Sequence, residues 1–405
     1  MTDLDIEGAV AALSSWQEET YLWLHQNPEL SMAEKETCDF IDKQLQGFGY
    51  ETQRIGGGVV GVLQNGEGKT TLFRADIDAL PVKEDTGFEY ASTMTRLDAQ
   101  GNEVPVMHAC GHDVHITAGL GAARILSENR QAWSGTHIAL FQPGEETAEG
   151  AKSMVEDGLV DKIPHPDVAL GQHVLAGPMA SGSVGTHSGA ILSTGASLKI
   201  TVHGKGSHGS MPHLGVDPVV LASAIVMRLQ TIVSREINPF KMAVVTVGSL
   251  QAGSKSNIIP DRATLLLNIR AYDMEVREHL LEAIKRMVNA ECEAAGAPAP
   301  AEFELYDSYP LTNNDAETTQ TVTEAFIAHF GSDRVCDCGE VSASEDFSTI
   351  PDAFGIPYSY WGLGGFNEGD PKYPNHNPKF GPVMQPTLAT GTEAILAAVM
   401  AWLKK

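Results

Sequence analysis

The sequence of 405 residues is poor in cysteine, in positive charge and in long apolar runs. Its five cysteines are an odd and sparse set for this length, which argues for reduced thiols and against a disulfide framework. Lysine and arginine number 27 against 52 acidic residues, a net charge of -25, and this charge opposes binding to nucleic acid or to anionic membrane surfaces. No stretch reaches the roughly 18 uninterrupted apolar residues of a membrane span, and the acidic start "MTDLDIEGAV" is unlike an export signal. We therefore expect a cytoplasmic protein with no nucleic-acid and no membrane partner.

Strand-like and helical patterns divide the chain into three parts. Apolar runs at 70–80, 135–146 and 167–174 alternate with helical patterns, which is typical of an α/β layered domain with a mixed, largely parallel sheet. After a glycine-rich stretch the order becomes strand, helix, strand, strand, helix, strand, the ferredoxin-like β-α-β-β-α-β unit. The α/β pattern then resumes. We therefore predict a larger domain in two parts with a smaller domain inserted into it, with the boundaries 1–192, 193–308 and 309–405.

Three histidines, a cysteine and an aspartate crowd into "MHACGHDVH" at 107–115, just before a helical pattern. A loop between a strand and a helix of an α/β sheet faces the crevice in which ligands bind. Cys110 and His112 are good ligands for zinc-like metals. Two ligands do not make a site, however, and a histidine-rich loop is often only a polar loop. Other ligands must decide between these interpretations.

Further candidates stand at the ends of apolar strands and in a stiff loop. "FQPGEE" presents the adjacent carboxylates Glu145 and Glu146, which diverge, so one can bind a metal while its neighbour reaches a metal-bound water. His173 closes the apolar strand "DVALGQHV", and His376 lies between asparagines and prolines in "YPNHNPKF". Each also has an ordinary explanation: carboxylates that complement a helix dipole, a satisfied core histidine and an exposed loop histidine.

Taken together, the candidates match the needs of two metal ions. Two four-coordinate ions offer roughly eight positions, and a bridging Cys110 thiolate with a bridging water would fill four of them. The other four match the remaining candidates: His112, Glu146, His173 and His376. Such a pair of ions polarises a carbonyl and generates hydroxide. Glu145, beside the ligands but outside their set, is then the natural general base.

Six motifs come in the order found in the metal-dependent aminoacylases: "ACGHDVH", "FQPGEE", "GQHV", "GKGSHGSMPH", "SNIIPD" and "SASEDF". The chain resembles this amidohydrolase family over essentially its whole length. The family includes hippurate hydrolases and hydrolases of indole-acetyl amino acids. Stretches such as "QTIVSRE" look most like the aminoacylases that release fatty or aromatic acids, including N-alpha-acyl-glutamine aminoacylases. One departure is Gly144, where alanine is usual.

The resemblance implies a fold similar to the co-catalytic zinc peptidases, with two metals in a catalytic domain and an inserted lid domain that dimerises. The implied metal ligands and base coincide with those found from the residues: Cys110, His112, Glu146, His173, His376 and Glu145. In the lid, His208 matches the histidine that reaches across a dimer to stabilise the oxyanion of the tetrahedral intermediate. Asn257 and Arg270 resemble the polar pair that grips the free carboxylate of the substrate.

Asp76 and Asp78 align with a short motif that supplies a ligand and its orienting aspartate in the wider superfamily. The histidine of that motif is missing here. We therefore expect Asp78 to support a metal ligand without binding the metal; an ordinary aspartate in a turn at a strand end is the alternative.

These features predict an amidohydrolase that splits N-acyl-L-amino acids into a carboxylic acid and a free amino acid, as a homodimer joined through its lid. Thiolate and imidazole ligands favour two Zn²⁺ ions, with Mn²⁺ or Co²⁺ as alternatives. Two other functions stay open: a dipeptidase or carboxypeptidase on the same scaffold, and a non-catalytic metal-binding relative. Glu145 beside a full ligand set argues against the last.

Overall fold

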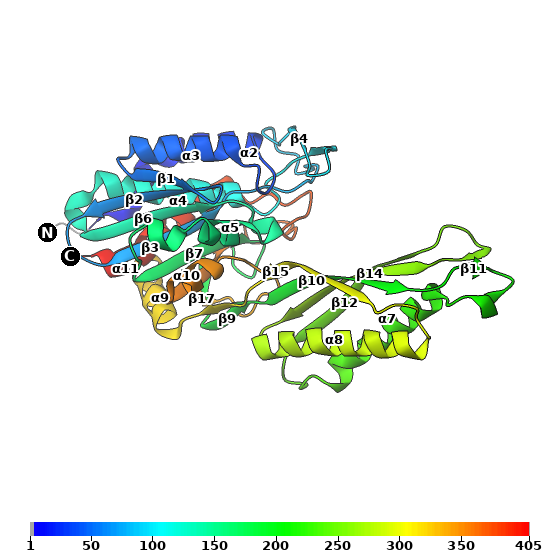
Figure 1. Ribbon diagram of the computed structural model, residues 1–405. Helices are drawn as coiled ribbons and strands as arrows, with labels where there is room; N and C mark the ends of the chain where they lie inside the picture. The colour runs from blue at the N-terminus through cyan, green and yellow to red at the C-terminus, as the bar shows by residue number, and fades with distance from the viewer. Residues whose placement is uncertain (1–3, 405) are drawn as a thin grey trace. The chain divides into compact units, whose positions relative to one another are not determined.

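The computed structural model describes residues 4–404, which form two compact units (Figure 1). The smaller unit comprises Leu192–Thr312 and Ser342–Glu345, and the larger unit comprises the remainder. The sequence placed the insertion at 193–308 and did not anticipate the short second segment. That segment belongs to the smaller unit because the main-chain N–H of Ser193 donates to the carbonyl oxygen of Ala343 at 2.9 Å.

An eight-stranded mixed sheet forms the centre of the larger unit, in the order β1-β2-β6-β3-β7-β18-β8-β17. The pairs β6–β3, β3–β7, β7–β18 and β8–β17 are parallel. Strands β6 and β18 are buried along their whole length, as expected for strands that helices cover on both faces. The α/β fold with a largely parallel sheet is therefore confirmed. The strands are Glu51–Ile55 (β1), Gly58–Asn65 (β2), Thr70–Asp76 (β3), Gly135–Gln142 (β6), Val168–Leu175 (β7), Val184–Thr186 (β8), Val335–Asp337 (β17) and Tyr358–Gly364 (β18).

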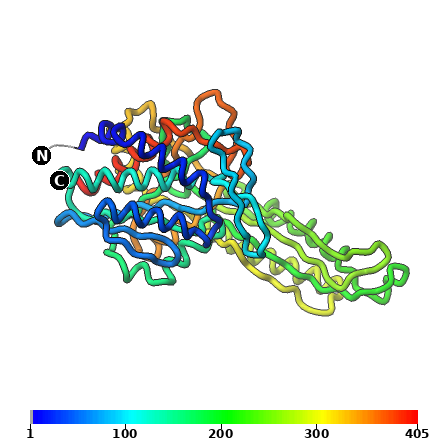
Figure 2. Tube along the Cα trace, turned by 90° about the horizontal axis from the view of Figure 1, so that it is seen from above, coloured from blue at the N-terminus to red at the C-terminus, as the bar shows by residue number. Residues whose placement is uncertain are grey.

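Helices cover both faces of this sheet. Helices α4 and α11 pack against β3 and against each other, and α2 and α3 lie on either side of α4 (Figure 2). Helices α5 and α10 contact each other on the opposite face (Figure 1). The helices are Ile6–Ala12 (α1), Ser14–Gln26 (α2), Lys35–Gly47 (α3), His112–Glu128 (α4), Gly150–Glu156 (α5), Leu159–Lys162 (α6), Ala316–Phe330 (α9), Thr349–Phe354 (α10) and Met384–Leu403 (α11). A short hairpin, Thr95–Leu97 (β4) and Glu103–Pro105 (β5), completes the unit.

Small residues in "HDVHITAGLGAARILSE" let α4 approach its neighbours closely. A side chain at Gly121 would lie 2.9 Å from Nε2 of Gln17 and 3.1 Å from Oγ1 of Thr392. Those two groups hydrogen-bond to each other at 2.6 Å. The buried helix thus holds α2 and α11 together and presents its first residue, His112, at the carboxyl ends of the parallel strands.

The smaller unit has the strand and helix order expected from the sequence. Its antiparallel sheet runs β12-β14-β10-β15, and α7 and α8 cover one face of it (Figure 1). Asp217 and Asp273 cap the two helices by accepting backbone N–H groups of the first turn. The elements are Thr194–His203 (β10), Ser207–His208 (β11), Pro218–Arg235 (α7), Ala243–Ala252 (β12), Ile258–Ile259 (β13), Arg262–Ala271 (β14), Met274–Ala294 (α8) and Glu302–Tyr309 (β15), and Gly189–Leu192 (β9) and Thr312–Asn314 (β16) stand where the chain passes between the units.

Helices α7 and α11 are each long and apolar enough, by length and composition, to cross a membrane. Most of α11 is buried in the core of the larger unit. Helix α7 packs Leu221, Ile225 and Leu229 into the core of the smaller unit. Packing within each unit therefore accounts for the apolar character of α11 and of one face of α7.

A buried ion-pair network joins α2 to α4. Nδ1 of His25 lies 2.7 Å from Oδ2 of Asp113, and Nε2 lies 3.2 Å from Oε1 of Glu84. Burial lowers the pKa of His25, but the hydrogen bonds to Asp113 and Glu84 outweigh it and raise the pKa to about 9. His25 is therefore held as a cation between two carboxylates.

This network predicts a loss of stability on the alkaline side. The folded pKa lies above the unfolded one, so the stabilisation is complete below pH 6.5 and disappears as the pH rises through about 9. The free energy of unfolding should fall by about 3 kcal/mol over this window, and urea unfolding at several pH values measures it. In His25→Gln the decline should be much shallower; equal slopes for both proteins would contradict the assignment.

Candidate metal centre

The candidate ligands come from loops at the carboxyl ends of neighbouring strands in the larger unit. Cys110 precedes α4, and His112 is the first residue of that helix. Gly111 between them has a φ of 81°, and a side chain there would overlap Cγ1 of Val174. His173 stands on β7, and Glu146 lies in the short helical turn Glu145–Thr147, which begins three residues after the end of β6. Only glycine at 111 allows the two ligand residues to flank this close approach to β7.

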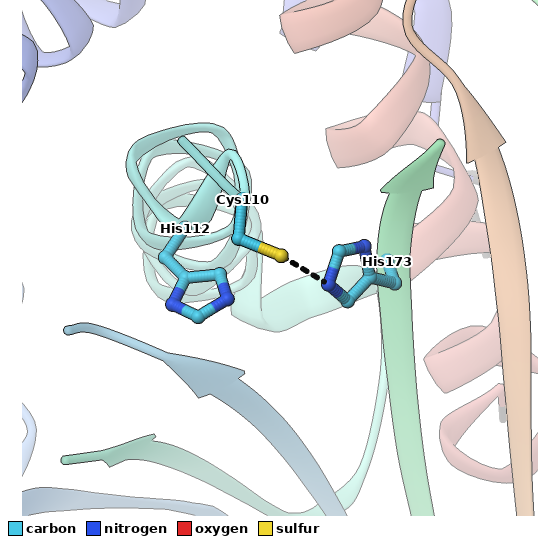
Figure 3. Close-up of side chains that lie close together, drawn as sticks. All are labelled: Cys110, His112 and His173. Carbon is cyan, nitrogen blue, oxygen red and sulfur yellow. Dashed lines mark hydrogen bonds between the residues drawn. The ribbon is translucent and has the colours of Figure 1, made fainter. Parts of the chain in front are cut away.

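The ligand atoms fall into groups that share Cys110. The ligand atoms of Cys110, His112 and His173 all lie within 4.8 Å of one another. Figure 3 shows the sulfur of Cys110 directed at His173, with Sγ and Nε2 3.4 Å apart. Cys110, Glu146 and His376 form a second group within the same limit. A thiolate common to two groups is the arrangement that a bridging ligand requires.

The remaining contacts close the cluster. Nε2 of His376 lies 3.2 Å from Oε2 of Glu146, and the ligand atoms of His112, Glu145 and Glu146 form a third group within 4.8 Å. The His376 backbone has a φ of 70°, and its N–H donates to the carbonyl oxygen of Ala109 at 2.8 Å. A left-handed backbone at a non-glycine residue is strained and persists where the surroundings enforce it, often at functional sites. All five candidate ligands and Glu145 thus meet in one place.

Two atoms of the cluster test whether it fits a metal. Nε2 of His112 and Oε1 of Glu146 are buried and make no hydrogen bond with any described residue. Buried polar atoms are normally paired, because leaving them unpaired costs free energy. Sulfur, imidazole nitrogen and carboxylate oxygen are ligands of zinc-like ions. The residues therefore fit a metal centre.

Carbonyl groups set the orientation of both imidazoles. Nδ1 of His112 lies 2.8 Å from the main-chain oxygen of Asp78 and 3.2 Å from its Oδ1. Nδ1 of His173 lies 2.8 Å from the carbonyl oxygen of Val174. A carbonyl can only accept, so each Nδ1 carries a proton, and in the neutral ring Nε2 is left with its lone pair for a metal. Asp78 therefore contacts His112 on the side away from Nε2, and its support of a bound metal stays a prediction.

The electrostatics of the cluster favour cations. Burial, followed by the charges of Glu146 and Glu145, raises the pKa of the Cys110 thiol well above its usual range. Burial lowers the pKa of His112, but Asp76 and Asp78 outweigh it and raise the pKa to about 10. Burial and the neighbouring carboxylates therefore keep the proton on Cys110, the carboxylates keep His112 protonated, and divalent ions would replace these protons.

A polar network that the sequence reasoning missed lies beneath the ligands. Nδ1 of His115 lies 2.5 Å from Oδ1 of Asp76, and its Nε2 accepts the N–H of Val174 at 2.8 Å. Arg74 donates to Asp76 at 2.7 Å and to Asp346 at 3.1 Å. Asp76, which aligns with the missing histidine of the superfamily motif, is thus held by Arg74 and His115. The sequence signals were His115 at the end of "MHACGHDVH" and the alignment of Asp76 with the superfamily motif; nothing in the sequence marked Arg74.

The candidate substrate-binding residues belong to the smaller unit, but the structure does not bring them together. Asn257 directly precedes β13, and β13 comes shortly before Arg262, where β14 begins. Arg270 stands near the far end of β14. Eight residue steps along β14 separate Arg262 from Arg270, about 27 Å at the usual rise per residue. The expected pair of Asn257 and Arg270 therefore cannot grip one carboxylate within a single chain, because an extended strand holds them apart.

His208 lies at the Asn257 end of that unit. It pairs with Ile258 in the two-stranded β11–β13 sheet, and Ile258 directly follows Asn257. Its Nδ1 accepts the N–H of Ser210 at 3.2 Å and the hydroxyl of Ser210 at 2.7 Å. In the neutral ring the proton is then on Nε2, so His208 is an exposed hydrogen-bond donor.

Arg270 is already engaged near the other end of the sheet. Its Nη1 donates to the carbonyl oxygen of Ser342 at 2.8 Å and to Oγ of Ser344 at 3.2 Å. Its Nε donates to Oδ1 of Asn268 at 3.1 Å. These contacts hold the guanidinium in a defined orientation.

An α/β sheet with clustered thiol, imidazole and carboxylate groups at the ends of its strands fits a metal-binding enzyme, and comparison with known proteins shows the family. The model of the family described as "Peptidase family M20/M25/M40" matches residues 72–401. The chain belongs to this family. It is an amidohydrolase, as the resemblance in its motifs implied.

Characterised relatives cover most of the chain. It is 35% identical to "Thermostable carboxypeptidase 2" of Saccharolobus solfataricus, over 93% of this chain and 92% of that protein. It is 36% identical to "N-acetyl-L-cysteine deacetylase" of Bacillus subtilis, over 88% and 81%. It is 37% identical to "Hippurate hydrolase" of Campylobacter jejuni, over 80% and 82%.

Solved structures share the fold over nearly the whole length. A putative aminohydrolase from methicillin-resistant Staphylococcus aureus has a TM-score of 0.87 and 33% identity, covering 98% of this chain and 99% of that one. The YXEP protein of Bacillus subtilis, described as a dinuclear metal-binding peptidase of the M20 family, has a TM-score of 0.77 and 28% identity, covering 96% and 99%.

The close approach at Gly111 yields a prediction. Gly111→Ala should lower the free energy of unfolding by about 1–3 kcal/mol and displace Cys110 and His112, so metal content should fall. Gly101→Ala is the matched control, because Gly101 has the same φ of 81° with open space around it. Metal analysis and urea unfolding of both variants decide; full metal content in Gly111→Ala would contradict the prediction.

Proposed function

We propose that the protein hydrolyses the amide bond of N-acyl-L-amino acids with two divalent metal ions held by Cys110, His112, Glu146, His173 and His376. The observation that carries the proposal is the meeting of these five residues with Glu145 at one edge of the sheet. Two bound ions would polarise the substrate carbonyl and supply a nucleophilic water at neutral pH. The mixed sulfur, nitrogen and oxygen ligands favour Zn²⁺, with Mn²⁺ or Co²⁺ as alternatives.

Glu145 acts as the general base and acid of this reaction. It is 5% exposed and lies within the group formed with His112 and Glu146. It takes the proton of the attacking water and passes it to the nitrogen of the leaving amino acid. The Nε2–H of His208 donates to the oxyanion that forms at the substrate carbonyl.

A homodimer joined through the smaller unit completes the site. Strand β12 is at the edge of its sheet, where unpaired backbone groups favour pairing with another chain. Helix α7 beside it exposes Val220 and Met227 by 66% and 72%. Because Asn257 and His208 lie far from Arg270 within one chain, we propose that the partner subunit supplies Asn257 and His208 to a site whose Arg270 is its own.

A carboxypeptidase or dipeptidase activity is the second candidate. The relative named a carboxypeptidase is as similar to this chain as the relative named a deacetylase. The two activities differ in whether the substrate bears a free α-amine. A panel of acetyl, decanoyl, benzoyl and indole-acetyl amino acids beside unmodified dipeptides separates them.

Glu145→Gln tests the mechanism. The variant should bind metal like the wild type but release free amine about 10²–10⁴-fold more slowly, since it lacks a general base. Release is measured on the acyl and dipeptide panels with metal-reconstituted protein. Equal rates of amine release for both proteins would show that Glu145 is not the general base. If neither protein releases amine from acylated amino acids, the proposed substrate class is wrong.

Mixed dimers test the shared site. Arg270→Ala and Asn257→Ala homodimers should each have much reduced kcat/KM. Refolded together, they should regain about one quarter of wild-type activity, because half of the dimers are mixed and each mixed dimer has one intact site. The control is each variant refolded alone. Failure to regain activity in verified mixed dimers would place both residues in the same subunit's site.

A further inference from the structure

The turn between α2 and α3 lies against the loop of Asp78, which orients His112, and against the loop that carries Glu145 and Glu146. Its carbonyl oxygen at Glu29 accepts the N–H of Ala79 at 2.8 Å, and Leu30 forms a β-bridge with Ala79. The N–H of Ala33 closes the turn on the carbonyl oxygen of Leu30 at 3.0 Å. Met32 at its corner has a φ of 62°, a conformation that such turns need and that favours glycine. A non-glycine residue held there indicates that neighbouring contacts enforce the shape of the turn.

Ser31 contacts the loop that orients His112. Its hydroxyl donates to Oδ2 of Asp78 at 2.7 Å. The same oxygen accepts the main-chain N–H of Glu146 at 3.0 Å, while the main-chain oxygen of Asp78 lies 2.8 Å from Nδ1 of His112. Asp78 therefore links three segments of the chain, and Ser31 restricts the rotation of its carboxylate.

Glu34 contacts the other loop. Its Oε1 accepts the N–H of Gly144 at 2.7 Å, and Gly144 directly precedes Glu145 and Glu146. Glu34 is only 4% exposed. Burial, and next the charge of Asp78, raise the pKa of Glu34 to about 8. A turn that only connects two helices does not need a buried carboxyl. The contact with Gly144 therefore indicates that Glu34 holds the Glu145–Glu146 loop in position.

Met32 explains the departure at Gly144. A methyl group at position 144 would overlap the sulfur of Met32 and lie 3.0 Å from its Cγ. The Gly144 backbone has a φ of 55°, which also favours glycine. The turn and the Glu145–Glu146 loop are therefore fitted to each other, with the Met32 side chain where an alanine at 144 would place its methyl group.

We propose that Ser31 and Glu34 are positioning residues of the metal centre: Ser31 aligns His112 and Glu146 through Asp78, and Glu34 aligns the Glu145–Glu146 loop through Gly144. The inference rests on the proposed function, since it assigns these residues to the same site. It adds the turn at 29–34 to the machinery, although this turn contains none of the candidate ligands.

The test measures metal binding and not only activity. Ser31→Ala and Glu34→Ala are compared with the wild type for Zn²⁺ affinity by chelator competition, and for the absorption spectrum of the Co²⁺-loaded protein. Loss of a residue that supports ligands typically weakens metal binding about 10–100-fold, and we expect this loss and a changed Co²⁺ spectrum in both variants. Ser31→Thr and Glu34→Gln keep a hydroxyl and an acceptor oxygen, and should restore both readouts.

Ser92→Ala is the matched control for lost stability. The Ser92 hydroxyl also makes a 2.7 Å hydrogen bond at a half-buried position of the larger unit, to the carbonyl oxygen of Val106. In urea unfolding, Ser92→Ala should show a decrease in the free energy of unfolding similar to that of Ser31→Ala. It should nevertheless bind metal like the wild type. If folded Ser31→Ala and Glu34→Ala have the Zn²⁺ affinity and the Co²⁺ spectrum of the wild type, this inference is wrong, and the proposed function is not affected. A wild-type protein that fails to bind two ions would instead overturn the proposed function.

Discussion

The structure depends on how the larger unit manages buried negative charge at the carboxyl ends of its parallel strands. Asp76, Asp78, Glu145 and Glu146 converge there, and all but Glu146 are almost fully buried. Arg74, itself 1% exposed, binds Asp76 and Asp346. Unpaired buried carboxylates are expensive, so this arrangement is stable only with cations, as protons on the nearby His112 and Cys110 or as metal ions. The same negative charge that would destabilise the fold without cations favours the binding of divalent ions.

The supports of this charge come from several segments. His115 joins Asp76 to the end of β7, Asp78 joins His112 to the Glu146 loop, and the turn at 29–34 contacts both loops. A metal centre of this type is therefore better described as a network of loops than as five ligands, and the rigidity of the sheet beneath them sets its precision.

The division into two units places different requirements on different residues. The candidate ligands and base belong to the larger unit, whereas His208, Asn257 and Arg270 belong to the smaller one. The long strand β14 keeps Arg270 apart from Asn257, so their separation follows from regular strand geometry. The family is shared by relatives named as deacetylases, hippurate hydrolases and carboxypeptidases; identity at this level defines the reaction class, while the acyl group depends on details of shape.

The α/β class, the order of the elements and the candidate ligands could be predicted because each has a local signature. Apolar runs mark buried strands, and "MHACGHDVH" or "FQPGEE" combine ligand types in a few residues. The polar supports had no such signature. No local pattern around Ser31, Glu34 or Arg74 indicates that these residues contact the ligand loops or their neighbours. The sequence by itself thus determined the α/β class and the order of the elements, and it singled out the side chains that we propose to bind metal and catalyse. Only the tertiary structure decided which neighbours orient them and which residues stay apart, because hydrogen bonds between segments distant in sequence depend on positions in space that no local pattern encodes.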